Sequence, residues 1–208
     1  MIIVGAKGHA REILDILKEK KIEYDLFFFD NVSTKSPSTF YNYHILSSEN
    51  ELSEIFQSDK RFALGLGGTR KRKDIVEIFK NCGGDFNSVI SNRAYISSNS
   101  IIGNGVNIMP FSSIIGNGIL GEGVLLNSYA SVHHDSYVGD FCELSPGSRI
   151  LGYCRIGEMC SIGTNAVVLP KISLCDNVII GAGSVVTKNI TEPGIYVGIP
   201  AKIIKDVK

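Results

Sequence analysis

The sequence predicts two domains of different class: a small Rossmann-like α/β domain over residues 1–90, and an all-β domain of short stacked strands over residues 91–208. Three observations support this division. Strand and helix patterns alternate up to residue 90, whereas from Ile96 onward an aliphatic residue recurs at every sixth position. Apolar residues make up 44% of the chain and the formal net charge is zero, which is typical of a folded globular protein.

The first ninety residues contain alternating strand and helix signals, which predict a small parallel sheet. Helix 10–20 carries its apolar residues on one face, and the strands are short apolar runs. The expected elements, in order, are a strand at Ile2–Val4, a turn at 5–9, a helix at 10–20, a strand at 26–29, a polar loop at 31–43, a short helix at 49–56, a strand at 62–66, a helix at 69–81 with Thr69 as N-cap, and a strand at 85–90.

The six-residue period decides the fold of the second domain. A helix is excluded because a period of six would spread the aliphatic residues around the whole helix. Small or β-branched residues lie four positions after most anchors, and glycine often follows the anchor directly. This pattern predicts a β-solenoid in which three hexapeptides form a coil of about 18 residues, with coils stacked by parallel pairing. The anchors are Ile96, Ile102, Ile108, Ile114, Leu120, Leu126, Val132, Val138, Leu144, Ile150, Ile156, Ile162, Val168, Leu174, Ile180 and Val186.

The composition excludes several classes of function. Lys+Arg and Asp+Glu are both 21, so the chain lacks the basic surplus that is usual in nucleic-acid-binding proteins. The apolar runs are too short for a membrane-spanning helix, and the start MIIVGAKGHA is unlike a secretory signal, so we expect a cytoplasmic protein. The five cysteines lack CxxC spacing, which argues against disulfides and a zinc site. Cys142, Cys154 and Cys160 occupy the small inward position and are expected to be core thiols.

A glycine-containing turn, Gly5-x-x-Gly8, separates the first strand from the first helix. Amides at such a helix start can bind a phosphate, and Asp30 ends the second strand, where an acid often meets a ribose hydroxyl. The full G-x-G-x-x-G fingerprint is absent, so NAD is not inferred. A tight turn that needs glycine for geometry alone remains the alternative.

The arrangement of both domains resembles the left-handed parallel β-helix acyltransferases of the sialic-acid O-acetyltransferase type. Within that type it resembles the bacterial N-acetyltransferases that act on UDP- or GDP-linked 4-amino-4,6-dideoxy sugars. The resemblance rests on Val4-Gly5-Ala6-Lys7-Gly8-His9, Phe29-Asp30-Asn31, Leu64-Gly65-Leu66-Gly67 with Arg72, Ser131-Val132-His133-His134-Asp135, and the tail Val197-Gly198-Ile199-Pro200-Ala201-Lys202.

The resemblance implies a homotrimer that uses acetyl-CoA as co-substrate in grooves between subunits. His134 is the expected general base, since acyl transfer to an amine needs a base with a pKa near 7, and Asp135 is expected to orient its ring. His133 is the competing histidine. The residues that match cofactor contacts are Glu143, Gly152, Thr164 and Ala182. The residues that match nucleotide-sugar contacts are Gly8, His9, Ala10, Asp30, Asn31, Gly67 and Arg72.

Gly152 has a second argument, from spacing: it lies one 18-residue coil after His134, where a ligand could approach the backbone. Two alternatives to amino-sugar N-acetylation stay open at this point. One is O-acetylation of sialic acid or another sugar, and the other is a β-helix that serves as a scaffold without catalysis. No metal is implied, because no His/Asp/Glu cluster has ligand spacing. The sugar, its nucleotide, the acyl chain length and the glycan served, glycoprotein or surface polysaccharide, are not identified by the sequence.

Overall fold

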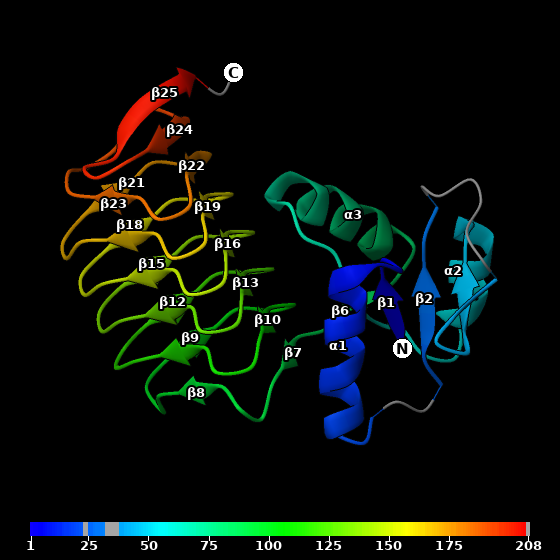
Figure 1. Ribbon diagram of the computed structural model, residues 1–208. Helices are drawn as coiled ribbons and strands as arrows, with labels where there is room; N and C mark the ends of the chain where they lie inside the picture. The colour runs from blue at the N-terminus through cyan, green and yellow to red at the C-terminus, as the bar shows by residue number, and fades with distance from the viewer. Residues whose placement is uncertain (23–24, 32–37, 207–208) are drawn as a thin grey trace. The chain divides into compact units, whose positions relative to one another are not determined.

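The computed structural model describes residues 1–22, 25–31 and 38–206 (Figure 1). The chain divides into two compact units, Met1–Gly67 with Lys71–Val89, and Gly68–Arg70 with Ile90–Lys208. Each unit has its own hydrophobic core.

The first unit is an α/β structure around one sheet in the order β3-β4-β2-β1-β5-β6. The sheet is parallel except for β3, which runs antiparallel to β4. Its elements are β1 (Ile2–Val4), α1 (Gly8–Glu19), β2 (Phe27–Phe29), β3 (Thr39–Phe40), β4 (Tyr43–Leu46), α2 (Glu49–Ile55), β5 (Arg61–Leu64), α3 (Thr69–Asn81) and β6 (Asp85–Phe86).

The amphipathic pattern of the helices explains their packing. The buried residues of α1 recur at helical spacing, so one face of the helix lies in the core. On α3, the Phe79 ring contacts both Phe29 of β2 and Phe62 of β5, with ring centroids 5.1 and 5.0 Å apart. The residues of α1 on the buried face are Ala10, Ile13, Leu14, Ile16 and Leu17.

The structure differs from the sequence-based expectation in three places in this unit. The expected polar loop over 31–43 lies partly outside the described residues, and its end forms the β3–β4 hairpin, with Tyr41 and Asn42 at positive φ in the turn. The expected strand 85–90 is two strands, because Phe86 pairs with Phe62 whereas β7 (Val89–Ile90) joins a sheet of the second unit. Helix α3 begins at Thr69 itself, so Thr69 is not the N-cap.

The second unit is a parallel β-helix with three faces. The first sheet contains β7, β10 (Asn107–Ile108), β13 (Leu125–Leu126), β16 (Glu143–Leu144), β19 (Ser161–Ile162), β22 (Val178–Ile180), β24 (Gly194–Val197) and β25 (Lys202–Asp206). The second contains β8 (Tyr95–Ile96), β11 (Ser113–Ile114), β14 (Ser131–Val132), β17 (Arg149–Ile150), β20 (Val167–Val168) and β23 (Val185–Val186). The third contains β9 (Ile101–Ile102), β12 (Ile119–Leu120), β15 (Tyr137–Val138), β18 (Arg155–Ile156) and β21 (Ser173–Leu174).

Successive coils pair with a register of 18 residues. Ile114 pairs with Val132, and Val132 pairs with Ile150. These anchors are fully buried, so the six-residue period corresponds to one inward side chain per face. The predicted fold class, an α/β domain followed by a left-handed β-helix of hexapeptide repeats, is confirmed.

The cysteines of the small inward position lie in the core of the β-helix. Cys142, Cys154 and Cys160 are completely buried, and all five cysteines are free thiols. The backbone N–H of Cys160 donates to Sγ of Cys142 at 3.3 Å, one coil apart. Burial raises the pKa of the Cys142 thiol well above its ordinary value, so this thiol stays protonated and unreactive.

One corner of the β-helix is lined by glycines at 18-residue spacing, Gly103, Gly121, Gly139 and Gly157. A Cβ built on Gly139 would lie 2.7 Å from the carbonyl carbon of Gly157 and 2.8 Å from the backbone nitrogen of Glu158. The backbone of the following coil therefore occupies the space that a side chain would need.

Among the described residues, we find no helix that combines the length and the apolar character needed to cross a bilayer.

Candidate active site

His134 lies in the turn between β14 and β15, two residues after the buried anchor Val132. Its side chain is 52% exposed, so the ring faces outward from the core. Nδ1 of His134 lies 3.0 Å from Oδ2 of Asp135. Asp135 has φ +58°, a left-handed conformation that aspartate tolerates better than most residues, and this turn brings its carboxylate beside the ring.

The charge state of Asp135 determines the proton position on His134. The pKa of the Asp135 carboxyl is lowered, first because the His134 ring donates a hydrogen bond to it and second because the Asn117 amide does. An ionised carboxylate can accept a hydrogen bond but cannot donate one. Nδ1 of His134 must therefore carry the proton, and Nε2 of a neutral ring is left with a free lone pair that can act as a base.

Two glycines make room for the His134 side chain. A Cβ built on Gly116, one coil earlier, would lie 2.8 Å from Cβ of His134. A Cβ built on Gly152, one coil later, would lie 2.6 Å from both Cε1 and Nε2. The imidazole therefore occupies the space over Gly152, at the 18-residue spacing that the sequence predicts.

We expect Gly152→Ala to reduce kcat by about 10²-fold, because the new methyl group would push the imidazole out of its position. The ring is the free end of a flexible side chain and can rotate away, so the thermal unfolding temperature should stay near that of the unchanged protein. Steady-state kinetics and circular dichroism melting measure the two effects. An unchanged kcat would contradict this account of Gly152.

His133, the competing histidine, has a different environment. The pKa of His133 is lowered, first by burial and then by the positive charges of His134 and Arg149. The hydrogen bond to a carboxylate that fixes the tautomer belongs to His134. The structure therefore favours His134 as the base.

Three of the four residues predicted to contact the cofactor lie on two corners of the β-helix, and the fourth, Glu143, lies in a strand. Gly152 shares the corner of His134, in the turn after β17. Thr164 and Ala182 lie one coil apart, in the exposed turns after β19 and β22. These turns precede strands of the second sheet, whereas Gly152 follows a strand of that sheet. Glu143 begins β16. Its Oε2 accepts a hydrogen bond from the N–H of Gly68 at 2.6 Å, and Gly68 belongs to the second unit. One chain alone does not gather the four residues at one point.

In the first unit, three loops meet at the carboxyl edge of the sheet. The turn after β1, Asp30 after β2, and the glycine-rich segment after β5 all follow parallel neighbouring strands. The contacts are close, because a Cβ built on Gly5 would lie 2.8 Å from the carbonyl oxygen of Gly65. Ligands of open parallel sheets bind at this edge. The predicted residues Gly8, Asp30, Asn31 and Gly67 therefore belong to one edge.

Helix α1 presents its amino end at the same edge. Its N-cap, Lys7, makes no side-chain capping hydrogen bond, and the first turn carries no acidic residue. The backbone N–H groups of this first turn are therefore suited to binding an anion. His9 contacts Glu12, with Nδ1 2.9 Å from Oε2, whereas Ala10 is buried beneath Gly65 and can offer a ligand only its backbone.

Arg72, which the resemblance matches to a nucleotide-sugar contact, lies in the interior of the first unit's helix packing and not on a solvated face. Its side chain is fully buried, and Nη1 donates to the carbonyl oxygen of Leu66 at 2.7 Å. The guanidinium thus holds the loop that follows β5. A role of Arg72 at the nucleotide remains a prediction.

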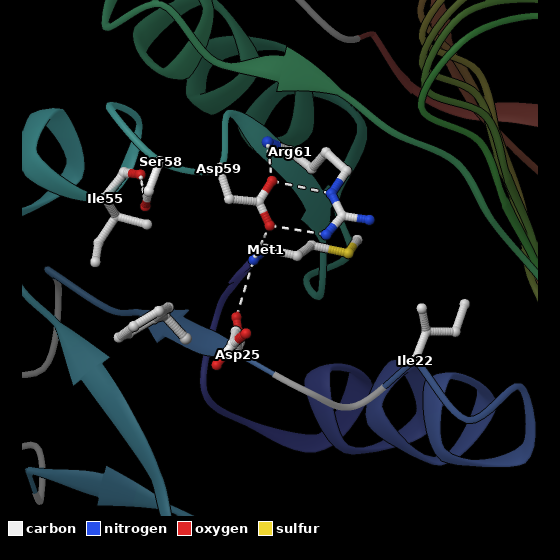
Figure 2. A pocket seen from close by; sticks show the side chains of 8 residues that line it. Met1, Ile22, Asp25, Ile55, Ser58, Asp59 and Arg61 are labelled. Atoms are coloured by element: carbon white, nitrogen blue, oxygen red, sulfur yellow. Dashed lines mark hydrogen bonds and ion pairs between the residues drawn. The ribbon is translucent and has the colours of Figure 1, made fainter.

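A hollow of about 720 Å³ lies at the opposite, amino-terminal edge of the same sheet, and Figure 2 shows side chains that line it. Asp59 is bound there by Arg61, with Nη2 2.8 Å from Oδ2, and by the amino nitrogen of Met1 at 2.7 Å from Oδ2. The Arg61 side chain lowers the pKa of the Asp59 carboxyl. These charges already satisfy one another, so the hollow is not a candidate site.

Asn117 and Tyr153 contact the His134–Asp135 pair, and neither residue is among those that the sequence analysis names. Asn117 Nδ2 donates to Oδ1 of Asp135 at 3.3 Å, and the Tyr153 ring meets the His134 ring edge-on at 5.1 Å. The 18-residue spacing could have identified them, because both residues are 18 positions from Asp135. Searched over the described residues, the structure contains no group of three His, Cys, Asp or Glu side chains that could hold a metal.

Comparisons with known proteins agree with this architecture. The PglD N-terminal domain model matches residues 1–79, and the bacterial transferase hexapeptide model matches residues 153–188. No curated protein matches the sequence.

Three solved structures show the similarity over the whole chain. The acetyltransferase domain of PglB from Neisseria gonorrhoeae in complex with acetyl-CoA has a TM-score of 0.90 at 26% identity, and covers 98% of both chains. PerB from Caulobacter crescentus, in complex with CoA and GDP-perosamine, has a TM-score of 0.89 at 25% identity, over 98% of this chain and 96% of that chain. WeeI from Acinetobacter baumannii has a TM-score of 0.89 at 25% identity over 98% of both.

Fold, repeats and matches together define the class: the chain is an acyltransferase built on hexapeptide repeats. More particularly, residues 1–79 match the PglD N-terminal domain model, and the fold is similar to that of the PglB, PerB and WeeI structures.

Proposed function

We propose that the protein is an acetyl-CoA-dependent N-acetyltransferase that acts on a nucleotide-linked 4-amino-4,6-dideoxy sugar. The observation that carries the proposal is the His134–Asp135 pair, which leaves Nε2 as a base on the outer surface of the β-helix. The similar structures of PglB with acetyl-CoA and of PerB with CoA and GDP-perosamine support the choice of substrates.

The reaction follows from the position of the base. The neutral sugar amine attacks the carbonyl carbon of the thioester, and Nε2 of His134 takes a proton from the nitrogen as the new C–N bond forms. The C–S bond then breaks, and the imidazolium returns the proton to the leaving CoA sulfur. Asp135 keeps the Nδ1–H in place and stabilises the transient positive charge of the ring.

The expected binding sites use both units. The carboxyl edge of the first unit, with the amides of Gly8, His9 and Ala10, offers donors for the nucleotide diphosphate, and Asp30 and Asn31 offer groups for the ribose. Of the residues expected to contact the cofactor, Gly152 lies on one corner of the β-helix and Thr164 and Ala182 lie on another. A homotrimer would bring one corner of each subunit beside a different corner of its neighbour. We therefore propose that acetyl-CoA binds in the groove between subunits.

A panel of acceptors tests the function. The release of CoA thiol from acetyl-CoA is measured with UDP-, GDP- and dTDP-linked 4-amino-4,6-dideoxy sugars and with free and CMP-linked sialic acid. We expect release with one amino sugar and an amide product by mass spectrometry. Release with sialic acid alone would replace the proposal by O-acetylation. If CoA does not stabilise the protein in a thermal shift and none of the acceptors reacts, the proposal fails in favour of a scaffold.

A further inference from the structure

Three side chains on one corner of the β-helix stack in successive coils at 18-residue spacing. They are Asn117, Asp135 and Tyr153, and we refer to them as the 117–135–153 column. Asp135 lies in the middle, so one neighbour comes from the preceding coil and the other from the following coil.

Both outer members of the column act on the Asp135 carboxylate. The Asn117 amide donates to Oδ1 at 3.3 Å, while Oδ2 contacts His134 Nδ1 at 3.0 Å. The Tyr153 hydroxyl also lowers the pKa of Asp135, after the contributions of His134 and Asn117. The two oxygens are therefore engaged on different sides, which restricts rotation of the carboxylate.

Tyr153 also contacts the base itself. Its ring is nearly perpendicular to the His134 ring, at 87° with centroids 5.1 Å apart, which is the edge-to-face geometry that aromatic rings prefer. The backbone N–H of Tyr153 donates to the carbonyl oxygen of His134 at 3.0 Å. Tyr153 thus contacts both members of the pair from the following coil.

The backbone of this turn is fixed independently of the column. Ser136 Oγ donates to the carbonyl oxygen of Leu151 at 2.7 Å and accepts the N–H of Cys154 at 3.0 Å. Arg155 Nη1 donates to the carbonyl oxygen of Asp135 at 2.8 Å. Loss of a column side chain should therefore leave the turn in place and alter mainly the carboxylate and the ring.

A restraint is needed because the pair is exposed. The His134 and Asp135 side chains are 52% and 36% exposed, and a single hydrogen bond between exposed charged groups is weak in water. Aspartate is also short, so fewer of its rotamers reach the neighbouring ring than would those of glutamate. Without further contacts, Asp135 would hold the Nδ1–H of His134 for only part of the time.

We propose that Tyr153 and Asn117 are positioning residues for acyl transfer, which hold the Asp135 carboxylate so that His134 keeps its proton on Nδ1 and its lone pair on Nε2. This inference rests on the proposed function for its kinetic consequence, but its structural content, the state of the His134 ring, is measurable without any substrate.

The first test compares Tyr153→Phe, Tyr153→Ala and Asn117→Ala in the full-length protein. Tyr153→Phe keeps the ring contact and loses the hydroxyl, and we expect kcat to fall about fivefold with KM unchanged. For Tyr153→Ala, which also loses the ring contact, we expect a larger fall in kcat. Tyr129→Phe is the matched control, because Tyr129 also lies in a turn at positive φ and is 64% exposed, but it stacks on Phe111 instead. The control should behave as the unchanged protein.

The second test reads the ring directly. Nitrogen-15 NMR distinguishes a protonated from an unprotonated ring nitrogen, and with four histidines in the chain the His134 signals can be assigned from the spectrum of His134→Ala. We expect the Nδ1–H tautomer to dominate in the unchanged protein and in Tyr129→Phe, and its share to fall in Tyr153→Ala and Asn117→Ala. An equal share of the Nδ1–H tautomer in the unchanged protein and in all three variants would overturn the inference.

The third test uses a longer carboxylate. In the background Asp135→Glu, the extra methylene reaches the ring without the column, so adding Tyr153→Phe should lower kcat less than twofold relative to Asp135→Glu alone. An equal loss in both backgrounds, or a raised KM with kcat unchanged, would show that Tyr153 acts elsewhere, and would overturn the inference. If the unchanged protein acetylates none of the acceptors, the proposed function fails, whereas the NMR comparison still decides the inference.

Discussion

Replacing His134 with alanine is expected to lower kcat for acetyl transfer by about 10³-fold, because the change removes the group that we propose accepts the amine proton in the transition state. The ring is exposed and makes no part of the hydrophobic core, so the variant should fold normally. Acetyl-CoA should still bind and raise the melting temperature, since the base is not needed for ground-state binding. Thiol-release kinetics and thermal shift measure the two properties on the same sample.

His133→Ala is the matched control for this experiment, since it removes the adjacent histidine from the same turn. We expect kcat to change less than about threefold, because the Asp135 carboxylate that sets the tautomer lies against Nδ1 of His134 and not against His133. If His133→Ala abolished the reaction and His134→Ala did not, the assignment of the base would be reversed.

The second large effect is on stability. Gly139→Ala is expected to reduce the free energy of unfolding by about 3 kcal/mol. Its Cβ would lie 2.7 to 2.8 Å from backbone atoms of Gly157 and Glu158, and backbone in a paired coil cannot rotate away as a side chain can. Relief requires the two coils to separate, at the expense of hydrogen bonds such as the one from Gly139 N–H to the Ile156 carbonyl oxygen at 2.9 Å.

Urea unfolding followed by circular dichroism, at fixed protein concentration, measures this loss. Gly8→Ala is the control, because a Cβ at Gly8 has no atom within 4 Å and the residue lies in the first turn of α1. Its stability should be unchanged or slightly higher. Gly152→Ala makes a second comparison, since the same methyl group there meets a mobile imidazole. Equal unfolding midpoints for Gly139→Ala and Gly8→Ala would contradict this account of coil packing.

The β-helix was predictable because its sequence repeats one local rule. Each anchor, such as Val132 or Ile150, needs an aliphatic side chain because it is buried in the core of the β-helix. Sixteen consecutive aliphatic residues at this spacing leave little ambiguity about the fold. The same spacing predicts that Gly152 lies against His134, since stacked coils place residues 18 apart in contact.

The remaining differences come from contacts that a local pattern does not contain. The β3–β4 hairpin is stabilised by pairing of β4 with β2, and its two-residue turn of Tyr41 and Asn42 lacks the glycine that usually indicates such a turn. The chain passes from β6 to β7 within an apparently continuous strand signal, because the two ends pair in different sheets.

The candidate site also depends on contacts between residues that are distant in the sequence. His134 and Asp135 are adjacent in sequence, but the direction of an exposed carboxylate depends on Asn117 and Tyr153 in other coils. Likewise, the resemblance implies a nucleotide-sugar contact for Arg72 but not its burial, whereas in the structure its guanidinium donates to the carbonyl oxygen of Leu66 in the interior.

The constant 18-residue register also bears on how the chain folds. Every new coil closes a loop of the same short length, as Ser113 with Ser131 and then Ser131 with Arg149, so the entropic cost of each step is similar and small. In the first unit, β1 must pair with β5, where Ile2 lies opposite Phe62, 60 residues later (62 − 2 = 60). We therefore expect the β-helix to grow coil by coil from any pair already formed, whereas the sheet of the first unit assembles only after a long segment has been gathered.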